Sequence, residues 1–237
     1  MLLIVLCIII IAAIVGMIAV IVDIGKRNGH KPFGPYERYW KRGLDAFLST
    51  GALIVLSPLL LATAILVKVK LGSPVLFSQD RPGRDGKIFK LFKFRTMLPP
   101  EEGQEGVEYD AARLTPFGKK LRSTSLDELP ELLNILKGDM AVVGPRPLLV
   151  QYLARYSPYQ ARRHEVRPGF TGLAQVHGRN AISWEEKFDW DVKYVDHITF
   201  KGDCKIIMDT LRIVIKREGI SGGESATMTE FMGSAEK

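Results

Sequence analysis

The run AFLSTGALIVLSPLLLATAILV, residues 46–67, contains no charged residue and is interrupted at its middle by Ser57 and Pro58. An interior proline removes the hydrogen bond to the carbonyl of Ile54 and kinks a helix there. Each half of the run is then about 17 Å long at roughly 1.5 Å per residue, which is too short to cross a bilayer. The run therefore predicts two short helices that meet at Ser57 and Pro58.

The charges around this run bear on its topology. Basic residues flank both of its ends, at Lys41, Arg42, Lys68 and Lys70. Because cations favour the cytoplasmic side of a membrane, neither end resembles an outside end. We expect a re-entrant helix hairpin over residues 41–70, which enters and leaves the membrane by its cytoplasmic face. The alternative is a second spanning helix with a tolerated proline.

A second apolar run lies at the N-terminus. Residues 1–22 carry no charge, and as a helix they would be roughly 33 Å long, enough to cross a hydrocarbon core of roughly 30 Å. Lys26 and Arg27 follow the run rather than precede it, which differs from a cleaved signal peptide. The sequence predicts a transmembrane helix over residues 1–24 with its N-terminus outside, followed by a cytoplasmic linker over residues 25–40.

The composition excludes several classes of protein. Of the 237 residues, 33 are Lys or Arg and 26 are Asp or Glu, so the formal charge is +7, and 46% are apolar. That apolar content excludes disorder, and two distant cysteines, Cys7 and Cys204, provide neither a disulfide framework nor a zinc site. The length fits one domain with attachments. The basic charge alone also permits a non-catalytic membrane-anchored scaffold or a nucleic-acid-binding module.

Residues 71–220 have the pattern of a small cytoplasmic α/β domain that is rich in helices. Pro74–Ser78 and Lys87–Met97 predict a β-hairpin, and the acidic residues 99–112 predict a solvated loop. Thr115-Pro116 predicts a helix start. The other predicted elements are helices at Leu129–Leu136, from Ser157, from Ser183 and near 203–217, a short strand at Met140–Val143, a turn-rich connection or binding loop at Arg167–Gly172 and a mobile tail at 221–237.

Asp127 and Glu128 form an acidic pair between two predicted helices. One interpretation is structural: Ser125 and Glu128 fit a capping box, and Asp127 in a first turn meets the helix dipole favourably. Pro130 favours another interpretation, in which the regular helix starts at Pro130 and the pair lies in its entry turn. In either geometry Asp127 is near free backbone N–H groups. Such groups keep a carboxylate ionised, as a nucleophile or a magnesium ligand requires.

For several basic residues the predicted backbone indicates the direction in which the side chain projects. Lys93 and Arg95 are two residues apart on a predicted strand, so they project from one face. Arg146 lies between Pro145 and Pro147 at a strand end, where a stiff backbone presents a guanidinium to phosphate as a planar fork. Each of these cations alone is consistent with a solvated surface. Together they predict a binding site for a doubly charged anion.

The motifs and their order resemble one family. They are Lys41-Arg42 with Asp45, Ser57-Pro58 in the apolar run, Phe77-x-Gln79-x-Arg81-Pro82-Gly83, Phe92-Lys93-Phe94-Arg95-Thr96-Met97, Arg122-x5-Asp127-Glu128-Leu129-Pro130, Leu136-Lys137-Gly138-Asp139-Met140, Gly144-Pro145-Arg146-Pro147 and Arg167-Pro168-Gly169. From Lys41 to Gly219 the chain resembles the bacterial sugar transferases known as monotopic phosphoglycosyl transferases. Within that family it is most similar to the undecaprenyl phosphate N,N'-diacetylbacillosamine 1-phosphate transferases, which start bacterial protein N-glycosylation.

The resemblance implies an activity. The family transfers a sugar 1-phosphate from a UDP-sugar to a polyprenyl phosphate such as undecaprenyl phosphate, and it releases UMP with Mg²⁺ as cofactor. The resemblance implies that Asp127 is the covalent nucleophile, and that Glu128 acts as a base for the acceptor phosphate or supports the metal. Lys93, Arg122 and Arg146 would hold phosphate or nucleotide. This agrees with the chemistry of a carboxylate nucleophile whose reaction is assisted by cations.

The resemblance also implies a place in the cell. We expect an enzyme of the bacterial inner membrane with a cytoplasmic catalytic domain, in contact with membrane lipids. The expected partners are downstream glycosyltransferases, and not nucleic acid. The helix over residues 1–24 is an addition to the smallest family members, which begin near Lys41. Which UDP-sugar is used, and which glycoconjugate is made, stay open.

Overall fold

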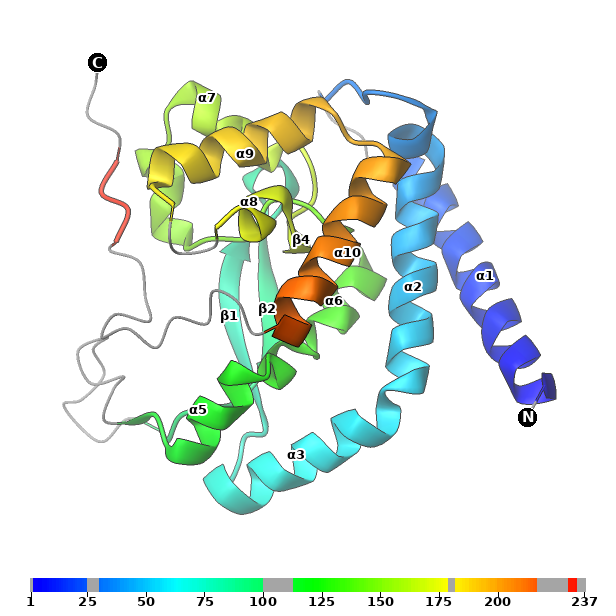
Figure 1. Cartoon of the computed structure of the whole chain (residues 1–237), viewed down its shortest axis with the longest axis vertical. Helices are drawn as coiled ribbons and strands as arrows, with labels where there is room; N and C mark the ends of the chain where they lie inside the picture. The colour runs from blue at the N-terminus through cyan, green and yellow to red at the C-terminus, as the bar shows by residue number, and fades with distance from the viewer. Residues whose placement is uncertain (1, 25–29, 100–112, 179–181, 217–229, 234–237) are drawn as a thin grey trace.

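The fold of the chain is mixed and rich in helices, with two small sheets among the residues that the structure describes. The computed structural model describes residues 2–24, 30–99, 113–178, 182–216 and 230–233. Figure 1 shows α1 (Leu2–Ile24) and α2 (Lys41–Val55) side by side at one edge of the molecule, with α3 (Ser57–Leu71) turning away across its base. This is the helix-rich architecture that the sequence predicts.

The predicted break in the apolar run is present. Leu56 separates α2 from α3, with φ −88° and ψ 2°. Pro58 lies in the first turn of α3, where a helix needs no N–H from it. Ser57 Oγ donates a hydrogen bond of 2.8 Å to the carbonyl of Ile54. The side chain of Ser57 therefore satisfies the carbonyl that Pro58 leaves without its helical partner.

The helices differ in whether their length and hydropathy would allow them to cross a membrane. In the part of the chain that the structure describes, no single helix is long and apolar enough. The segments Tyr36–Val55 and Ser57–Leu71 meet the criterion together, as a pair bent by 64°. Tyr36–Trp40 is a π-helical turn that leads into α2, so helical structure begins inside the stretch expected to be a linker.

α1 packs on α2 through small residues. Ala12, Gly16 and Ala19 are buried on one face of α1, whereas its large apolar side chains, where described, are mostly exposed. A Cβ atom at Gly16 would lie 2.8 Å from the carbonyl oxygen of Gly43 in α2. Any larger residue at Gly16 would push the two helices apart, because small residues are what permits so close an approach.

The predicted hairpin is present, but its first strand is longer and its second strand is shorter than the predicted Pro74–Ser78 and Lys87–Met97. β1 (Leu76–Pro82) pairs antiparallel with β2 (Ile88–Phe94). The chain reverses through a short 3-10 turn at Arg84–Gly86, which is closed by a hydrogen bond of 2.8 Å from the N–H of Gly83 to the carbonyl of Lys87. β1 thus continues through residues that the sequence analysis did not assign to a strand.

The helix boundaries on either side of the acidic pair follow local signals. α5 (Pro116–Ser123) is capped by Thr115, whose side chain accepts a hydrogen bond of 3.0 Å from the N–H of Gly118. α6 (Glu131–Lys137) ends at Gly138, which has φ 92° in the left-handed region. The predicted start of α5 is confirmed. α6 begins later than the predicted Leu129–Leu136.

A second sheet joins distant parts of the chain. β3 (Ala141–Val143) is the predicted short strand, and its parallel partner is β4 (Gly169–Thr171). The expected loop at Arg167–Gly172 is therefore wrong for the three residues of β4. Parallel partners are far apart in sequence and need no turn between them, so no local pattern indicated this strand.

The remaining helices start at capped residues. Two of them begin after Ser157 and Ser183, as predicted, and each of these serines forms a capping box. A third begins earlier than its predicted start near Asp203. The α-helices of this part are α7 (Pro158–Ala161), α8 (Leu173–Val176), α9 (Trp184–Asp196) and α10 (Phe200–Lys216). Two 3-10 helices, at Val150–Arg155 and Arg162–His164, lie on either side of α7.

Phe231 differs from the expectation of a mobile tail over residues 221–237. It is 2% exposed and packs in an aromatic cluster with Tyr152 and Phe188, its ring centroid 5.0 Å from that of Phe188. Burial of a large aromatic ring anchors this part of the chain. Of the predicted tail the structure describes only residues 230–233, and residues 100–112 of the predicted acidic loop also lie outside the described residues.

Candidate active site

The acidic pair lies in the entry turn of α6. Leu126–Glu128 form one 3-10 turn, and Ser125 before it has φ 55°, in the left-handed region. Ser125 makes no side-chain cap hydrogen bond, and the carboxylate of Glu128 binds cations instead of backbone, so the capping-box interpretation is wrong. The other interpretation is confirmed: the pair precedes a regular helix whose N-cap is Pro130.

Glu128 is held between two cations from different elements. Its Oε1 atom accepts a hydrogen bond of 2.6 Å from Lys93 Nζ on β2 and another from Nη2 of Arg146. Burial alone raises the pKa of this carboxyl, but Arg146 and Lys93 together lower it to about 2. Glu128 is therefore ionised over the whole physiological range of pH.

Asp127 has the opposite electrostatic environment. It is 7% exposed, and no ion pair to it is found among the described residues. Burial and the charge of Glu128 raise its pKa to about 6, against the opposing influence of Lys93 and Arg122. The expectation that backbone N–H groups keep Asp127 ionised is wrong in its physical cause, because burial raises the pKa of Asp127 more than those groups lower it. Its carboxylate is thus short of positive charge.

The two other predicted cations separate in the structure. Arg122, in the last turn of α5, donates a hydrogen bond of 3.0 Å to Thr96 Oγ1, and its charge lowers the pKa of Asp127. Arg95 lies just beyond the end of β2 and donates to the carbonyls of Ser73, at 3.0 Å, and Leu71. Arg95 thus binds backbone at the end of α3, whereas Lys93 binds Glu128.

The backbone around Arg146 is fixed from both sides. The carbonyl of Pro145 accepts a hydrogen bond of 3.0 Å from the N–H of Gly169, at the start of β4. The carbonyl of Arg146 accepts a bond of 2.7 Å from Nη2 of Arg163, which is itself buried. Pro145 and Pro147 restrict the backbone further. Together these contacts hold the guanidinium of Arg146 at Glu128.

Glu131 is a member of the site that the sequence analysis does not predict. Its side chain is 1% exposed and lies 3.2 Å from Lys93 Nζ. Burial and the charge of Glu128 raise the pKa of Glu131 to about 7. The one feature of the sequence that could have indicated Glu131 as a site residue is its position three residues after Glu128. That position equally fits an ordinary acidic residue in a first helical turn.

A cavity of about 70 Å³ lies beside Ser125 and Glu128. Its other walls come from Phe170 and Thr171 on β4, from Gln175 on α8 and from the second half of α10. The Oε1 atom of Gln175 is buried and has no hydrogen-bond partner in the described part of the chain. Gln175 is a second residue that the sequence analysis does not predict, because α8 and the entry turn are distant in sequence.

These features indicate a class of protein. A buried carboxylate with a raised pKa, next to an ionised carboxylate and cations held in place, is typical of the catalytic site of an enzyme. The chain belongs to the bacterial sugar transferase family, whose model matches residues 36–217. This confirms the family that the motifs predict.

Named relatives match most of the chain. The uncharacterized sugar transferase EpsL of Bacillus subtilis is 50% identical over 196 residues, which are 83% of this chain and 97% of that protein. The UDP-N-acetylgalactosamine-undecaprenyl-phosphate N-acetylgalactosaminephosphotransferase of Aeromonas hydrophila is 37% identical over 190 residues, 76% of this chain and 45% of that protein. The UDP-glucose:undecaprenyl-phosphate glucose-1-phosphate transferase of Klebsiella pneumoniae is 40% identical over 191 residues, 76% of this chain and 41% of that protein. The chain spans less than half the length of the latter two relatives.

Proposed function

We propose that this protein is a phosphoglycosyl transferase, which moves a sugar 1-phosphate from a UDP-sugar to undecaprenyl phosphate and releases UMP. The names of the Aeromonas and Klebsiella relatives state undecaprenyl phosphate as acceptor and support this reaction. The same names state two different sugars, N-acetylgalactosamine and glucose, so family membership does not select the donor sugar. The proposal is therefore made for the UDP-sugar class.

The observation that carries the proposal is the contrast between Asp127 and Glu128. Glu128 has both nearby cations, Lys93 and Arg146, while Asp127 is buried without an ion pair among the described residues. An unpaired carboxylate oxygen is available to attack phosphorus, whereas a carboxylate whose charge is stabilised by two cations is a weaker nucleophile. We therefore assign the role of nucleophile to Asp127.

The reaction then has two displacements. In the first, a carboxylate oxygen of Asp127 forms a bond to the β-phosphorus of the UDP-sugar, and the bond from that phosphorus to the bridging oxygen breaks, so that UMP leaves. In the second, a phosphate oxygen of undecaprenyl phosphate attacks the same phosphorus, and the acyl phosphate bond to Asp127 breaks. The carboxylate is regenerated, and the acceptor carries a diphosphate sugar.

The neighbours of Asp127 have different parts in this scheme. With a pKa of about 2, Glu128 is a weak base, so we assign to it the holding of Lys93 and Arg146 in place. The guanidinium of Arg146 and the ammonium of Lys93 then face the phosphates of the donor. Arg122, whose charge already acts on Asp127, is a further candidate for phosphate binding.

We propose Mg²⁺ as the cofactor and Asp127 as a residue that would hold it. Mg²⁺ is commonly held by one or two carboxylates together with substrate phosphates and water. Asp127 provides such a carboxylate, and it is short of positive charge. When bound, the ion would neutralise charge on the transferring phosphoryl group.

We also propose that the enzyme acts at the bacterial inner membrane, with its catalytic domain in the cytoplasm. The bend between α2 and α3 suits a re-entrant hairpin, and α3 exposes apolar side chains at Leu61, Ile65 and Val69. Membrane lipids would cover these side chains, and downstream glycosyltransferases would receive the product. This arrangement brings a lipid-linked acceptor and a water-soluble donor to one face of the membrane.

Release of UMP tests the function. The full-length protein in detergent is incubated with Mg²⁺, undecaprenyl phosphate and each of a panel of UDP-sugars, and UMP is measured. Release that depends on both the acceptor and one donor supports the proposal. A folded protein that releases no UMP with any donor would favour the non-catalytic alternatives, the membrane-anchored scaffold or the nucleic-acid-binding module.

A further inference from the structure

The N-terminal helix ends in a buried acidic residue. Residues 1–35 precede the region that matches the family model, so α1 lies outside that match. Asp23, in the last turn of α1, is 5% exposed. A carboxylate so deeply buried needs a paired cation to be tolerated. Its partners therefore indicate what the end of α1 does.

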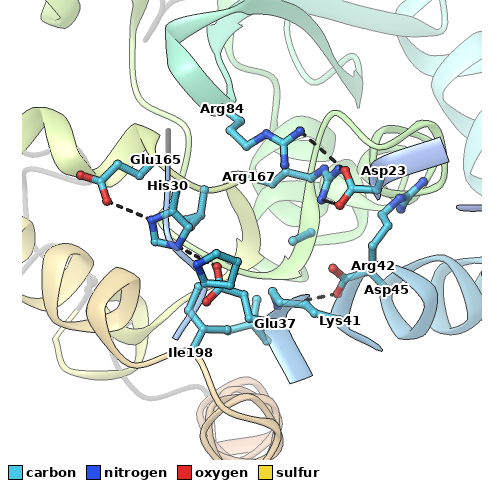
Figure 2. Close-up of a pocket in the computed structure, with 14 residues that line it drawn as sticks. Asp23, His30, Glu37, Lys41, Arg42, Asp45, Arg84, Glu165, Arg167 and Ile198 are labelled. Carbon is cyan, nitrogen blue, oxygen red and sulfur yellow. Dashed lines mark hydrogen bonds and ion pairs between the residues drawn. The ribbon is translucent and has the colours of Figure 1, made fainter. Parts of the chain in front are cut away.

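Two arginines from the catalytic domain bind Asp23. Figure 2 shows Arg167 and Arg84 converging on its carboxylate. Both Nη atoms of Arg167 donate to the two carboxylate oxygens of Asp23, and Nη2 of Arg84 lies 3.6 Å from Oδ1. Arg84 is in the turn of the β-hairpin, and Arg167 lies two residues before the start of β4. The end of α1 thus ties together two separate parts of the domain.

The position of Asp23 is set by close packing of α1. Ala12, Gly16, Ala19 and Asp23 are all buried, and their spacing places them on one stripe of the helix. The contact between Gly16 and Gly43 permits no displacement toward α2, because the backbones already touch. The packing of α1 on α2 therefore fixes the position of Asp23 relative to the rest of the protein.

Arg167 in turn fixes the segment that carries Arg146. Its Nε donates a hydrogen bond of 2.8 Å to the carbonyl of Gly138, at the end of α6. The carbonyl of the next residue, Pro168, accepts a hydrogen bond of 2.8 Å from the N–H of Ala141 in β3. A Cβ atom at Gly144 would lie 2.5 Å from the carbonyl oxygen of Arg167. This contact leaves no free space between the Arg167 backbone and the motif that contains Arg146.

We propose that Asp23 is a positioning residue of the catalytic centre, which acts through Arg167 on the placement of Arg146. Without Asp23, Arg167 would lose the carboxylate that both of its Nη atoms bind, and the β4 segment would shift. A shift of β4 moves Pro145 through its hydrogen bond with Gly169, and with it the guanidinium at Glu128. The effect on catalysis rests on the proposed function, whereas the pairing of Asp23 with Arg167 does not.

Asp23→Asn in the full-length protein tests the inference. We expect kcat for UMP release to fall by about tenfold, since small misplacements of catalytic groups cost this much or more. Asp85→Asn, an exposed acid in the same hairpin turn as Arg84, is the matched control and should leave kcat unchanged. In an Arg146→Lys background, Asp23→Asn should cost little more, because its effect passes through Arg146.

Two outcomes would overturn the inference. One is a wild-type kcat in Asp23→Asn with only a lower Tm, which would make α1 an anchor that stabilises without positioning. The other is full additivity of Asp23→Asn and Arg146→Lys in kcat. If Asp23→Asn fails to accumulate, Arg167→Lys, which keeps the charge and loses the paired contact, takes its place.

The pairing of Asp23 with Arg167 can be tested separately, by thermal unfolding. A thermal-unfolding cycle of Asp23→Asn, Arg167→Gln and the double variant measures their coupling without any substrate. Non-additive shifts in Tm support the pairing, and additive shifts overturn it. This cycle remains informative even if the wild-type protein releases no UMP, so failure of the inference and failure of the proposed function are distinguishable.

Discussion

Lys93 Nζ on β2 lies 2.6 Å from Oε1 of Glu128 in the entry turn of α6. This contact joins the β-hairpin to the acidic pair, and it determines which of the two adjacent carboxylates is neutralised. Because Glu128 takes the ammonium of Lys93 and the guanidinium of Arg146, Asp127 is left without a paired cation among the described residues. The different roles proposed for two adjacent acidic residues follow from this asymmetry.

Lys93→Met should damage both stability and activity. The change keeps much of the apolar stem but removes the cation between Glu128 and Glu131, which lie 2.6 and 3.2 Å from its Nζ atom. Loss of a charged hydrogen bond in a partly buried cluster should cost about 2 kcal/mol of unfolding free energy, and kcat/KM for the donor should fall at least about tenfold. Denaturant unfolding and UMP release measure the two effects.

The same strand provides a control for this substitution. Lys90 pairs with Asp80 at 2.8 Å, but both side chains are half exposed or more. Exposed pairs contribute little, so Lys90→Met should change the unfolding free energy by less than about 1 kcal/mol and leave kcat/KM unaltered. Equal effects of Lys90→Met and Lys93→Met would contradict the central place given to Lys93.

Glu131→Gln should alter how stability depends on pH. Burial and the charge of Glu128 raise the pKa of Glu131 from 4.5 to about 7, so between these pH values the folded protein binds more protons than the unfolded chain. The contribution of Glu131 to stability is therefore fully present below pH 4.5 and is lost as pH rises through about 7. Relative to the wild type, the Gln variant should gain stability between pH 5 and pH 8.

Tm measured against pH for both proteins checks this sign. Asp127, whose pKa is raised to about 6, contributes a slope in the same direction, but it is present in both proteins and cancels in their difference. Parallel Tm curves for wild type and Glu131→Gln would show that Glu131 has no raised pKa in the folded protein.

The hairpin of α2 and α3 should have both ends on one side of the membrane. In a background where Cys7 and Cys204 are serine, single cysteines at Arg38 and Lys70 mark the two flanks, both of which are exposed. A re-entrant hairpin predicts that a membrane-impermeant maleimide labels both in inside-out vesicles and neither in right-side-out ones. Opposite labelling of the two positions would establish a spanning pair instead.

Pro58→Ala tests the cause of the bend. The new N–H at position 58 is able to bond the carbonyl of Ile54, which Ser57 Oγ occupies at 2.8 Å in the structure. We expect the variant to shift toward a straighter helix and to label partly from the other side at position 70. Unchanged labelling would show that packing of α2 and α3, rather than the proline, sets the bend.

The parts of the fold that sequence reasoning predicts are those set by neighbouring residues. The caps at Thr115, Ser157 and Ser183 depend on groups within three residues, and all three are present. The break at Pro58 is equally local. β4 has its partner in a distant segment, and so no pattern near Gly169 predicts it.

The candidate site shows the same limit. Asp127 and Glu128 are recognisable as a pair, but the capping box failed because Lys93 and Arg146, distant in sequence, bind Glu128 more strongly than a backbone N–H would. Glu131 resembles an ordinary first-turn acid until the hairpin brings Lys93 beside it. Tertiary contacts of charged groups, and not local propensities, decide these roles.

Asp127→Asn decides the mechanism. The substitution nearly keeps the shape of the side chain but removes the anion, so both displacements should fall by about 10⁴-fold, which corresponds to about 5.5 kcal/mol of barrier. Donor binding should survive better, because Lys93, Arg122 and Arg146 remain. Glu128→Gln should impair turnover while still allowing some first displacement, and Asp80→Asn, an exposed acid on β1, should behave as wild type.

The intermediate itself provides the decisive measurement. The wild-type enzyme is exposed to a UDP-sugar and Mg²⁺ without undecaprenyl phosphate, quenched, digested and examined by mass spectrometry. A sugar-phosphate adduct should appear on Asp127, be absent in Asp127→Asn, and disappear from the wild type when the acceptor is added before quenching. An adduct on Glu128, or normal turnover by Asp127→Asn, would show that the carboxylate without an ion pair is not the nucleophile. Glu128, despite its two cations, would then have to be the residue that attacks phosphorus.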